Sequence, residues 1–287
     1  MFSVLMSCYK NDNVKFLYDS LLSIIHQTLP PDEVVLVKDG PLSKDLDGVI
    51  KIFIDKFPSV GINFVLVTLP INLGLGRALQ EGLNICSQKY IVRMDADDIS
   101  RLNRIESLAS IIRMNAGIDV LGSQIEEFLE SPGDLNRFRI VPLEHSEIVS
   151  FGRLRNPMNH VTVCFKKNVV IQAGGYEPML WLEDWFLWLK LINQNIRFLN
   201  VNEVHVDVRV GSLTERRMGL KYLMAELKFC KEAIRRDYWT LVSGFKYITS
   251  RILLRLLPAN FLRIIYSKIL RVSKIKISKK YTGVSKR

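Results

Sequence analysis

Short runs of apolar, largely β-branched residues alternate with segments of helical periodicity through the first part of this chain. The runs are Phe2–Ser7, Glu33–Lys38, Asn63–Thr68 and Tyr90–Met94. Between them the apolar residues recur at helical spacing, for example at Leu17, Leu21 and Ile24, with a repeat of roughly thirty residues. This alternation predicts an α/β fold built on a mostly parallel, doubly wound sheet.

The fourth apolar run ends abruptly in Asp95-Ala96-Asp97-Asp98. In open α/β sheets, ligands bind at the carboxyl ends of the strands. Three adjacent carboxylates repel one another unless a cation or a set of donors offsets their charge, and hard oxygen ligands suit Mg²⁺ or Mn²⁺. The alternative is a solvated loop that caps the next helix, from about Leu102. A calcium loop is excluded because Ile99 stands where an oxygen ligand belongs and Ser100 where glycine is needed.

A second candidate site is the segment Trp181-Leu182-Glu183-Asp184-Trp185, which opens an apolar helix running to about Asn193. Acids in the first turn of a helix are commonly only dipole partners. Here tryptophans bracket the acids, and aromatic faces pack on the C–H faces of pyranose rings. A sugar site and a simple helix start therefore both remain open. His160 and His205 could reach such a site, or each could be a satisfied structural residue.

The charge of the chain is concentrated at one end. Of 40 basic residues, 12 lie between Trp239 and Arg287, where no acid occurs, whereas the rest of the chain holds 28 basic and 29 acidic residues. A basic tail indicates either an anionic membrane surface or nucleic acid as its partner. The four cysteines are far apart and predict buried thiols in a reducing compartment, and the first residues show no secretory signal.

The tail combines this charge with helical periodicity. Leu241, Phe245, Ile248 and Ile252 recur at helical spacing, and a second such pattern follows Pro258. Basic amphipathic helices with aromatic residues are typical of segments that lie in a membrane interface. The alternative is that their apolar faces cap the preceding domain. Nucleic acid is disfavoured because aromatic residues are not interleaved with the charge for stacking on bases.

Taken together in their order, the motifs of the chain resemble family 2 glycosyltransferases with the GT-A (nucleotide-diphospho-sugar transferase) fold. The matching pieces are Val4-x-Met6-Ser7-x-Tyr9, Gln27-Thr28, Val37-x-Asp39-Gly40, Asn72-x-Gly74, Asp95-Ala96-Asp97-Asp98, Gly174-Gly175-Tyr176 and Glu183-Asp184. The segments from Asp39 to Pro41 and from Gly74 to Leu79 are most similar to bacterial enzymes that build O-antigen, capsule and exopolysaccharide, including the amylovoran type.

The resemblance assigns the donor site residue by residue. It implies that Asp39 accepts from the uracil N3–H with Ser7 and Tyr9 nearby. Asp97 would bind Mn²⁺ or Mg²⁺ directly, while Asp95 would hold the ribose or complete the metal site. The cation at Arg77 is the candidate diphosphate contact, because Leu79 and Gln80 stand where many members carry an Arg-Asn pair.

For the acceptor side, the resemblance implies that Asp184 is the general base. Trp181, Glu183, Trp185 and His160 are candidate acceptor contacts, and Arg209, Arg216 and Arg217 lie where phosphate-binding residues often occur. Phe186 replaces an acid that the family often carries two positions after the Glu-Asp pair. One base, one metal and no enzyme nucleophile imply direct displacement with inversion.

These observations predict a catalytic domain over residues 1–237, with a nucleotide-sugar half to about 115 and an acceptor half from about 116, and a membrane-associating tail over 238–287. The expected activity is transfer of a hexose, glucose or galactose, from a UDP-sugar to GlcNAc or GalNAc on undecaprenyl diphosphate, forming a β linkage. The expected location is the cytoplasmic face of the bacterial inner membrane, without nucleic acid. A non-catalytic membrane-bound scaffold that binds nucleotide or glycan is the alternative.

Overall fold

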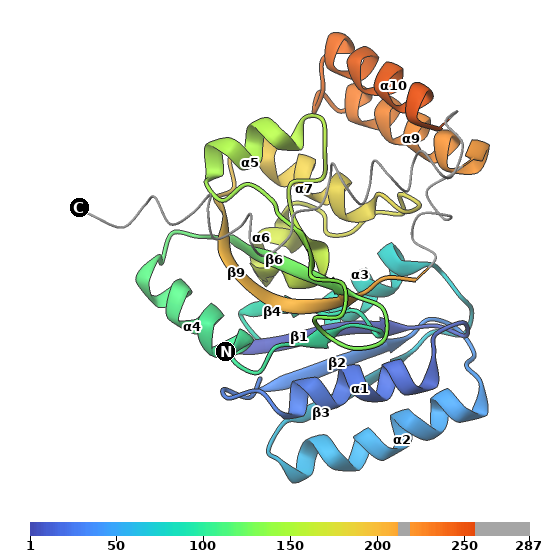
Figure 1. Ribbon diagram of the computed structural model, residues 1–287, viewed down its shortest axis with the longest axis vertical. Coiled ribbons are helices and arrows are strands. Elements are labelled where there is room, and N and C mark those ends of the chain that lie inside the picture. The colour runs from blue at the N-terminus through green and yellow to red at the C-terminus, as the bar shows by residue number, and fades with distance from the viewer. Residues whose placement is uncertain (212–218, 256–287) are drawn as a thin grey trace.

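The structure, a computed structural model, describes residues 1–211 and 219–255. Its first half is a parallel sheet in the order β3-β2-β1-β4. The strands are β1 (Phe2–Cys8), β2 (Glu33–Lys38), β3 (Asn63–Thr68) and β4 (Tyr90–Arg93). The connecting helices are α1 (Val14–Ile25), α2 (Lys44–Ser59) and α3 (Leu75–Ile85), with α1 and α2 on one face of the sheet and α3 on the other (Figure 1). The predicted alternation of strands and helices is confirmed.

In the second half, the sheet becomes mixed. It continues from β4 in the order β8-β6-β9-β5, with β7 on the side of β6, and only β6 and β9 pair in parallel. The strands are β5 (Ile99–Ser100), β6 (Val120–Phe128), β7 (Arg137–Arg139), β8 (Cys164–Lys166) and β9 (Phe198–Arg209). The helices are α4 (Arg104–Met114), α5 (His145–Gly152), η1 (His160–Thr162), α6 (Lys167–Gln172) and α7 (Glu183–Asn193).

The apolar segment from Val161 to Phe165 predicts a strand, and this prediction is wrong in its first part. That part is the short 3-10 helix η1, and only the end of the segment joins the sheet as β8. The cause is local, because Asn159 Nδ2 donates to Ser123 O at 2.8 Å and Thr162 N donates to Asn159 O, also at 2.8 Å. These bonds satisfy the backbone in a turn before the strand can begin.

Apolar residues are buried on both faces of the sheet. Because side chains alternate along a strand, β4 sends Tyr90 and Val92 into the core beside α1, α2 and α4, and Ile91 into the core beside α3 and α7. Strands buried on both faces read as continuous apolar runs, which explains why β1, β2 and β4 were recognisable in the sequence.

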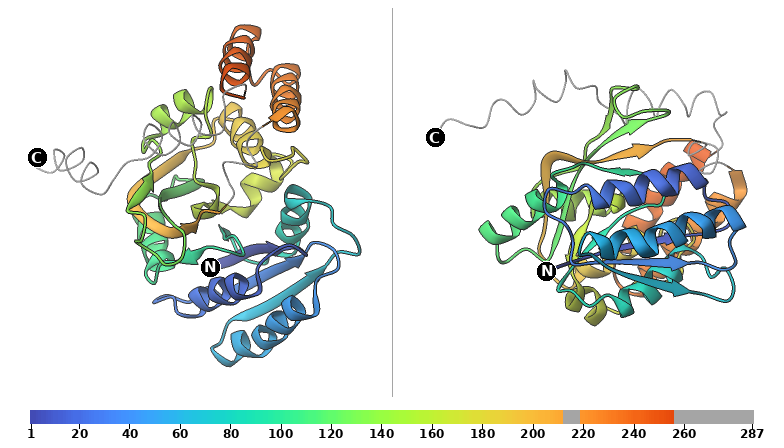
Figure 2. Two further views of the ribbon diagram at one scale, coloured as in Figure 1. Left: turned by 45° about the vertical axis from the view of Figure 1, so that its right-hand side comes forward. Right: turned by 90° about the horizontal axis from the view of Figure 1, so that it is seen from below.

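A third apolar cluster joins the helical hairpin of α9 (Gly219–Arg235) and α10 (Leu241–Arg255) to α7. Trp185 of α7 packs against Phe229, Trp239 and Tyr247 at ring-centroid distances of 4.8 to 5.8 Å. The hairpin lies at the end of the molecule opposite α2 (Figures 1 and 2). The inner face of α10 thus caps the catalytic domain, as the alternative for the tail proposed.

Within residues 1–211 and 219–255, no helix has the length and apolar character needed to cross a bilayer. All four cysteines are buried and free. The predicted second tail helix after Pro258, together with Arg216 and Arg217, lies outside the described residues. The division of the chain near residue 237 remains a prediction.

Candidate functional site

Three carboxylates meet at the carboxyl end of β4. Ligand oxygens of Asp95, Asp97 and Asp98 lie within 4.8 Å of one another. Asp97 is exposed, Asp95 is half-buried and Asp98 is only 1% exposed. A compact set of hard oxygen donors with an open side fits Mn²⁺ or Mg²⁺, which retain positions for water or substrate phosphate.

Hydrogen bonds from three other elements fix the backbone around these acids. Met94 N donates to Leu5 O at 3.1 Å, and Ser20 Oγ of α1 donates to Asp95 O at 2.8 Å. On the other side Arg104, fully buried in α4, donates from Nη2 to Arg93 O at 2.7 Å. The loop is therefore held in place by hydrogen bonds to its backbone, and the carboxylate of Asp97 is exposed.

The charges of the cluster are only partly offset within the protein. Arg93, 1% exposed, forms an ion pair with Asp95. Asp98 accepts from Arg209 N at 2.8 Å, but burial raises its pKa well above the usual value, and the adjacent Asp97 and Asp95 raise it further. Asp98 is thus a buried, structural member of the cluster. Asp97 is the exposed member of the cluster, and Asp95 is half-buried.

Asp39, the candidate for the uracil contact, joins two loops through hydrogen bonds to its side chain. Its Oδ1 accepts from Leu73 N at 2.6 Å and its Oδ2 from Gly74 N at 3.0 Å. Gly40, at φ +86°, has no room for a side chain, because a Cβ would lie 2.6 Å from Asn72 N. The motifs around Asp39 and Asn72 are therefore two halves of one structural unit. A uracil contact would use the remaining lone pairs of Asp39, and it stays a prediction.

The other donor-side candidates lie at the same edge of the sheet. β1 and β2 are parallel neighbours that end together, since Cys8 pairs with Lys38, and Asp39 N donates to Cys8 O at 2.8 Å. Ser7 is half-buried and Tyr9 is 38% exposed. Arg77 is exposed in the first turn of α3, where helix N-terminal N–H groups also favour phosphate.

Across this edge, the acceptor-side acids occupy the first turn of α7. Asp184 is half-buried, and its Oδ1 accepts from Trp185 N at 2.7 Å while its Oδ2 accepts from Asn156 Nδ2 at 2.5 Å. Glu183 is 8% exposed. Burial raises the pKa of Glu183 to about 7, and the charge of Asp184 adds to the shift. The two neighbouring acids therefore have different environments, one hydrogen-bonded and one desolvated.

Acids of the donor side and of the acceptor side influence the pKa values of the same buried groups. Burial raises the pKa of Tyr176, Arg93 opposes the shift, and Asp184, Glu183 and Asp95 add to it. Glu183 in turn is influenced by both Arg93 and Asp95. Acids that are 89 residues apart in the sequence, Asp95 and Asp184, therefore act on the same buried tyrosine. That they belong to one catalytic site remains a prediction.

His160 belongs to this region as a neutral group. Its Nε2 lies 2.9 Å from the Tyr176 hydroxyl, and burial together with Arg93 lowers its pKa well below the usual value. His205 does not join the acids. Its Nε2 lies 3.1 Å from Ser107 Oγ and 3.2 Å from Glu203 Oε2, so that it links β9 to α4.

The two predicted tryptophan contacts behave differently. Trp185 is wrong as an acceptor contact, because its ring is 3% exposed in the apolar cluster beneath α9 and α10 and its Nε1 donates to Gly152 O at 2.8 Å. Trp181 is half-buried at a φ of +64° and stacks on Tyr222 of α9 at 5.2 Å. A left-handed tryptophan is strained and is held here by the contacts around it.

Sequence reasoning missed four residues around the site. Asn156 holds Asp184, and Arg93 holds Asp95. Gln80 Oε1 accepts from Tyr176 N at 2.7 Å, which fixes the Gly174-Gly175-Tyr176 loop. Burial raises the pKa of Asp12 to about 7, and Asp97 and Asp95 contribute to the shift, so that a fourth acid approaches the cluster. The sequence contained a signal that could have identified Arg93, because an arginine inside an apolar strand is expected to be buried and to need a charged partner.

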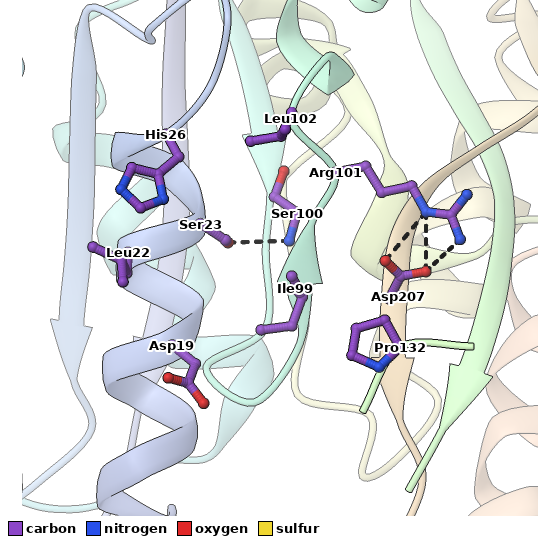
Figure 3. A pocket seen from close by; sticks show the side chains of 10 residues that line it. All are labelled: Asp19, Leu22, Ser23, His26, Ile99, Ser100, Arg101, Leu102, Pro132 and Asp207. Atoms are coloured by element: carbon purple, nitrogen blue, oxygen red, sulfur yellow. Dashed lines mark hydrogen bonds and ion pairs between the residues drawn. The ribbon is translucent and has the colours of Figure 1, made fainter. Parts of the chain in front are cut away.

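A separate groove lies beside the acid loop, between α1 and the strands β5 and β9 (Figure 3). Its volume is about 590 Å³, and Leu22, Ile99, Leu102 and Pro132 give it an apolar lining. Its cation, Arg101, is bound by Asp207 at 2.5 to 3.2 Å and by Glu126 at 2.5 Å. The arginine of the groove is therefore already paired with two acids, and Asp19 adds a further acid to the lining, which does not suit a diphosphate.

Known proteins resemble the chain in sequence and in fold. It is 38% identical to the UDP-Gal:α-D-GlcNAc-diphosphoundecaprenol β-1,3-galactosyltransferase of Escherichia coli, over 94% of this chain and 96% of that protein. It is 35% identical to the amylovoran biosynthesis glycosyltransferase AmsE of Erwinia amylovora, over 93% and 98% of the two chains.

Two solved structures share the fold at low identity. Staphylococcus aureus TarS 1–349 in complex with UDP-GlcNAc matches with a TM-score of 0.63 and 15% identity, over 88% of this chain and 71% of that chain. The mannosyltransferase PcManGT from Pyrobaculum calidifontis, in complex with GDP-Man and Mn²⁺, matches with a TM-score of 0.61 and 15% identity, over 91% and 78% of the chains.

The sheet, the acid cluster at its edge and these structural neighbours define a glycosyltransferase with the GT-A fold. Residues 3–176 match the model of glycosyl transferase family 2, and the chain belongs to this family. The predicted family and fold class are confirmed.

Proposed function

We propose that this enzyme transfers a hexose from a UDP-sugar to GlcNAc or GalNAc carried on undecaprenyl diphosphate, in an inverting, metal-dependent reaction that forms a β linkage. The observation that carries the proposal is that Asp95, which lies beside Asp97 in the acid cluster, and Asp184 both act on the buried Tyr176. Metal-binding carboxylates and a candidate base are thus supplied to one region by distant parts of the chain. This also argues against a non-catalytic scaffold.

On the donor side, Asp97 and Asp95 are the residues that would hold the metal ion. A divalent cation bound there would stabilise the negative charge of the departing diphosphate as a Lewis acid. The chain itself supplies the exposed Arg77 and the N-terminus of α3 as further phosphate contacts, and Ser7, Tyr9 and Asp39 as the uridine contacts. Arg93 orients Asp95 through their ion pair.

On the acceptor side, Asp184 is the proposed general base. It would take the proton from the acceptor hydroxyl while that oxygen attacks the anomeric carbon from the face opposite the diphosphate. Its Oδ1 accepts from Trp185 N and its Oδ2 from Asn156 Nδ2, so the carboxylate has a fixed orientation, and the proton would go to a remaining lone pair. Because no second carboxylate is needed as a nucleophile, a single displacement with inversion follows, and an α-linked donor sugar gives a β-linked product.

The acceptor and the donor sugar follow from the relatives. The Escherichia coli relative is named for galactose transfer to GlcNAc on diphosphoundecaprenol, and AmsE for amylovoran biosynthesis. Galactose is therefore the first donor sugar to test, with glucose second, and O-antigen or exopolysaccharide assembly is the proposed setting. A lipid-linked acceptor places the enzyme at the cytoplasmic face of the inner membrane.

The direct test is a panel of nucleotide sugars offered with GlcNAc and GalNAc on a diphosphate lipid, with Mn²⁺, with Mg²⁺ and with EDTA. We expect transfer from UDP-galactose or UDP-glucose, a product cleaved by a β-specific glycosidase, and loss of transfer in EDTA. Transfer that is undiminished in EDTA would refute metal dependence. A product with the α configuration would refute inversion, and nucleotide binding without transfer to any acceptor would favour the scaffold.

A further inference from the structure

The hairpin of α9 and α10 has two unlike faces. Its inner face is buried against α7 through Phe229, Ala233 and Tyr247, all 0% exposed. Its outer face carries large apolar side chains that are mostly exposed to solvent. They are Leu220 (76% exposed), Met224 (64%), Leu241 (75%), Val242 (63%) and Phe245 (75%). Exposed apolar residues gathered on one supersecondary unit mark an interaction surface.

On α10 these residues form one stripe. Leu241, Phe245 and Ile252 recur at helical spacing and are all exposed, whereas Gly244 and Tyr247 are buried against the protein and Ile248, at the edge of the stripe, is half-buried. Gly244 lets the two helices approach closely, since a Cβ there would lie 2.5 Å from Ile234. The hairpin is thus firmly packed, and its apolar stripe is directed outward by that packing.

The exposed charges around this surface are mainly positive. Lys221, Lys228, Lys231, Arg235 and Lys246 are exposed, whereas Asp237 in the turn is the exposed acid of the described hairpin. The other acids are neutralised within the hairpin. Glu226 is 1% exposed beside Tyr247 and Arg251, and Glu232 is paired with Arg235 and Arg236. Cations beside apolar side chains complement an anionic lipid surface.

The surface also adjoins the acceptor side of the site. Trp181 stacks on Tyr222, and Lys221 Nζ lies 5.8 Å from the centre of the Trp181 ring. Trp181 is three residues before the proposed base Asp184, and Leu180 beside it is 56% exposed. An apolar, cationic surface therefore begins where a lipid-linked diphosphate acceptor would have to enter.

We propose that the outer face of the α9–α10 hairpin docks on the anionic membrane surface and presents the α7 side of the site to the lipid-linked acceptor. The inference rests on the proposed function only for the identity of the acceptor. It extends the membrane contact from the basic tail into α9, which the sequence assigned to the catalytic domain.

The test is flotation of the full chain with vesicles of phosphatidylcholine alone and of phosphatidylcholine with phosphatidylglycerol. Leu241→Ser with Phe245→Ser should lower the partition into anionic vesicles at least about tenfold, as should Leu220→Ser with Met224→Ser. The control is Met114→Ser, which removes an apolar side chain that is 72% exposed at the end of α4. All variants retain the basic residues after 255, so any vesicle binding by those residues contributes equally to every variant.

Unchanged vesicle binding in both double variants would overturn the proposal. So would a concentration-dependent mass of the wild-type chain that Phe245→Ser abolishes, because the face would then be an interface with a second copy. Transfer to a water-soluble, short-chain acceptor separates this proposal from the function. The double variants should keep their rate with that acceptor and lose it only with acceptor embedded in vesicles. Absence of transfer by the wild type to either acceptor refutes the function while leaving the flotation result to decide the docking.

Discussion

The acid loop after β4 and the first turn of α7 both carry adjacent carboxylates, but the protein treats their charge in opposite ways. At the acid loop, an arginine that is 1% exposed pairs with Asp95, and Asp97 stays exposed. In the first turn of α7, Glu183 is desolvated and its pKa is raised to about 7, while Asp184 is held by hydrogen bonds. One region keeps negative charge available for a cation, and the other holds a single ionised base beside a carboxyl that resists ionisation.

The largest effect should follow removal of the exposed carboxylate of the acid loop. Asp97→Ala should lower turnover at least about 10³-fold, because the charge that stabilises the leaving diphosphate contributes several kcal/mol. Titration calorimetry should show that UDP binding loses its dependence on Mn²⁺. Asp55→Ala, at an exposed position on α2, is the matched control and should be without effect. Binding of UDP to the Asp97 variant that remains sensitive to EDTA would contradict the assignment.

In the first turn of α7, Asp184→Asn should reduce turnover by about 10²–10⁴-fold, the usual contribution of a positioned general base. UDP binding should be unaffected, because Asp184 belongs to the acceptor side. The amide oxygen can keep the contact with Trp185 N and the side chain keeps its size, so a folding defect is not expected, although the amide nitrogen cannot accept from Asn156 Nδ2. Single-turnover transfer and UDP calorimetry measure the two properties separately. A near-normal rate would remove Asp184 from its role and the comparison with the acid loop would fail.

The desolvated carboxyl of Glu183 should make stability depend on pH. Its folded pKa of about 7 lies above the ordinary glutamate value of 4.5, so the folded protein binds more protons than the unfolded chain between these values. Glu183 therefore makes no unfavourable contribution below about pH 4.5, and its cost grows as the pH rises to about 7, reaching at most about 3 kcal/mol. Above that range the cost stays constant.

Urea unfolding at pH 5 and pH 8 measures this cost. Glu183→Gln keeps the size of the side chain but cannot ionise, so the loss of stability between the two pH values should be smaller than in the wild type. Asp12 and Asp98 contribute in the same direction in both proteins, so the difference between the two proteins reports Glu183 alone. Equal losses in the two proteins would show that Glu183 is not desolvated in solution.

The position of the acid loop could be predicted from the sequence, whereas the surroundings of α7 could be predicted only in part. The reason is physical. The parallel half of the sheet is made by local patterns, such as the apolar run from Val34 to Val37, and its strand ends lie at one edge by topology alone. The role of Trp185 depends instead on α9 and α10, which follow in the sequence and cover its ring. A tryptophan beside two acids has the same local pattern whether it binds a sugar or fills a core.

Contacts between side chains that are far apart in the sequence could likewise not be predicted. Asn156 precedes Asp184 by 28 residues, and Gln80 precedes Tyr176 by 96. Nothing in the local pattern around either residue indicates its partner. Gln80 was noted only as a departure from the family motif, whereas in the structure it holds the Gly174-Gly175-Tyr176 loop, where Gly175 leaves room for its amide.

The smallest effect concerns Asn156, whose amide distinguishes the environment of Asp184 from that of Glu183. Asn156→Ala should lower turnover about tenfold, because a hydrogen bond to a charged acceptor contributes about 1.5–3 kcal/mol and part of it is replaced by water. The donor favours the charged carboxylate, so its loss should also move the acidic limb of the pH–rate profile to higher pH. A residue needed only for folding would lower the amount of active enzyme without moving that limb. Asn156→Gln, which retains the amide on a longer side chain, should recover part of the rate, and an unmoved profile in Asn156→Ala would show that Asp184 is oriented by Trp185 N alone.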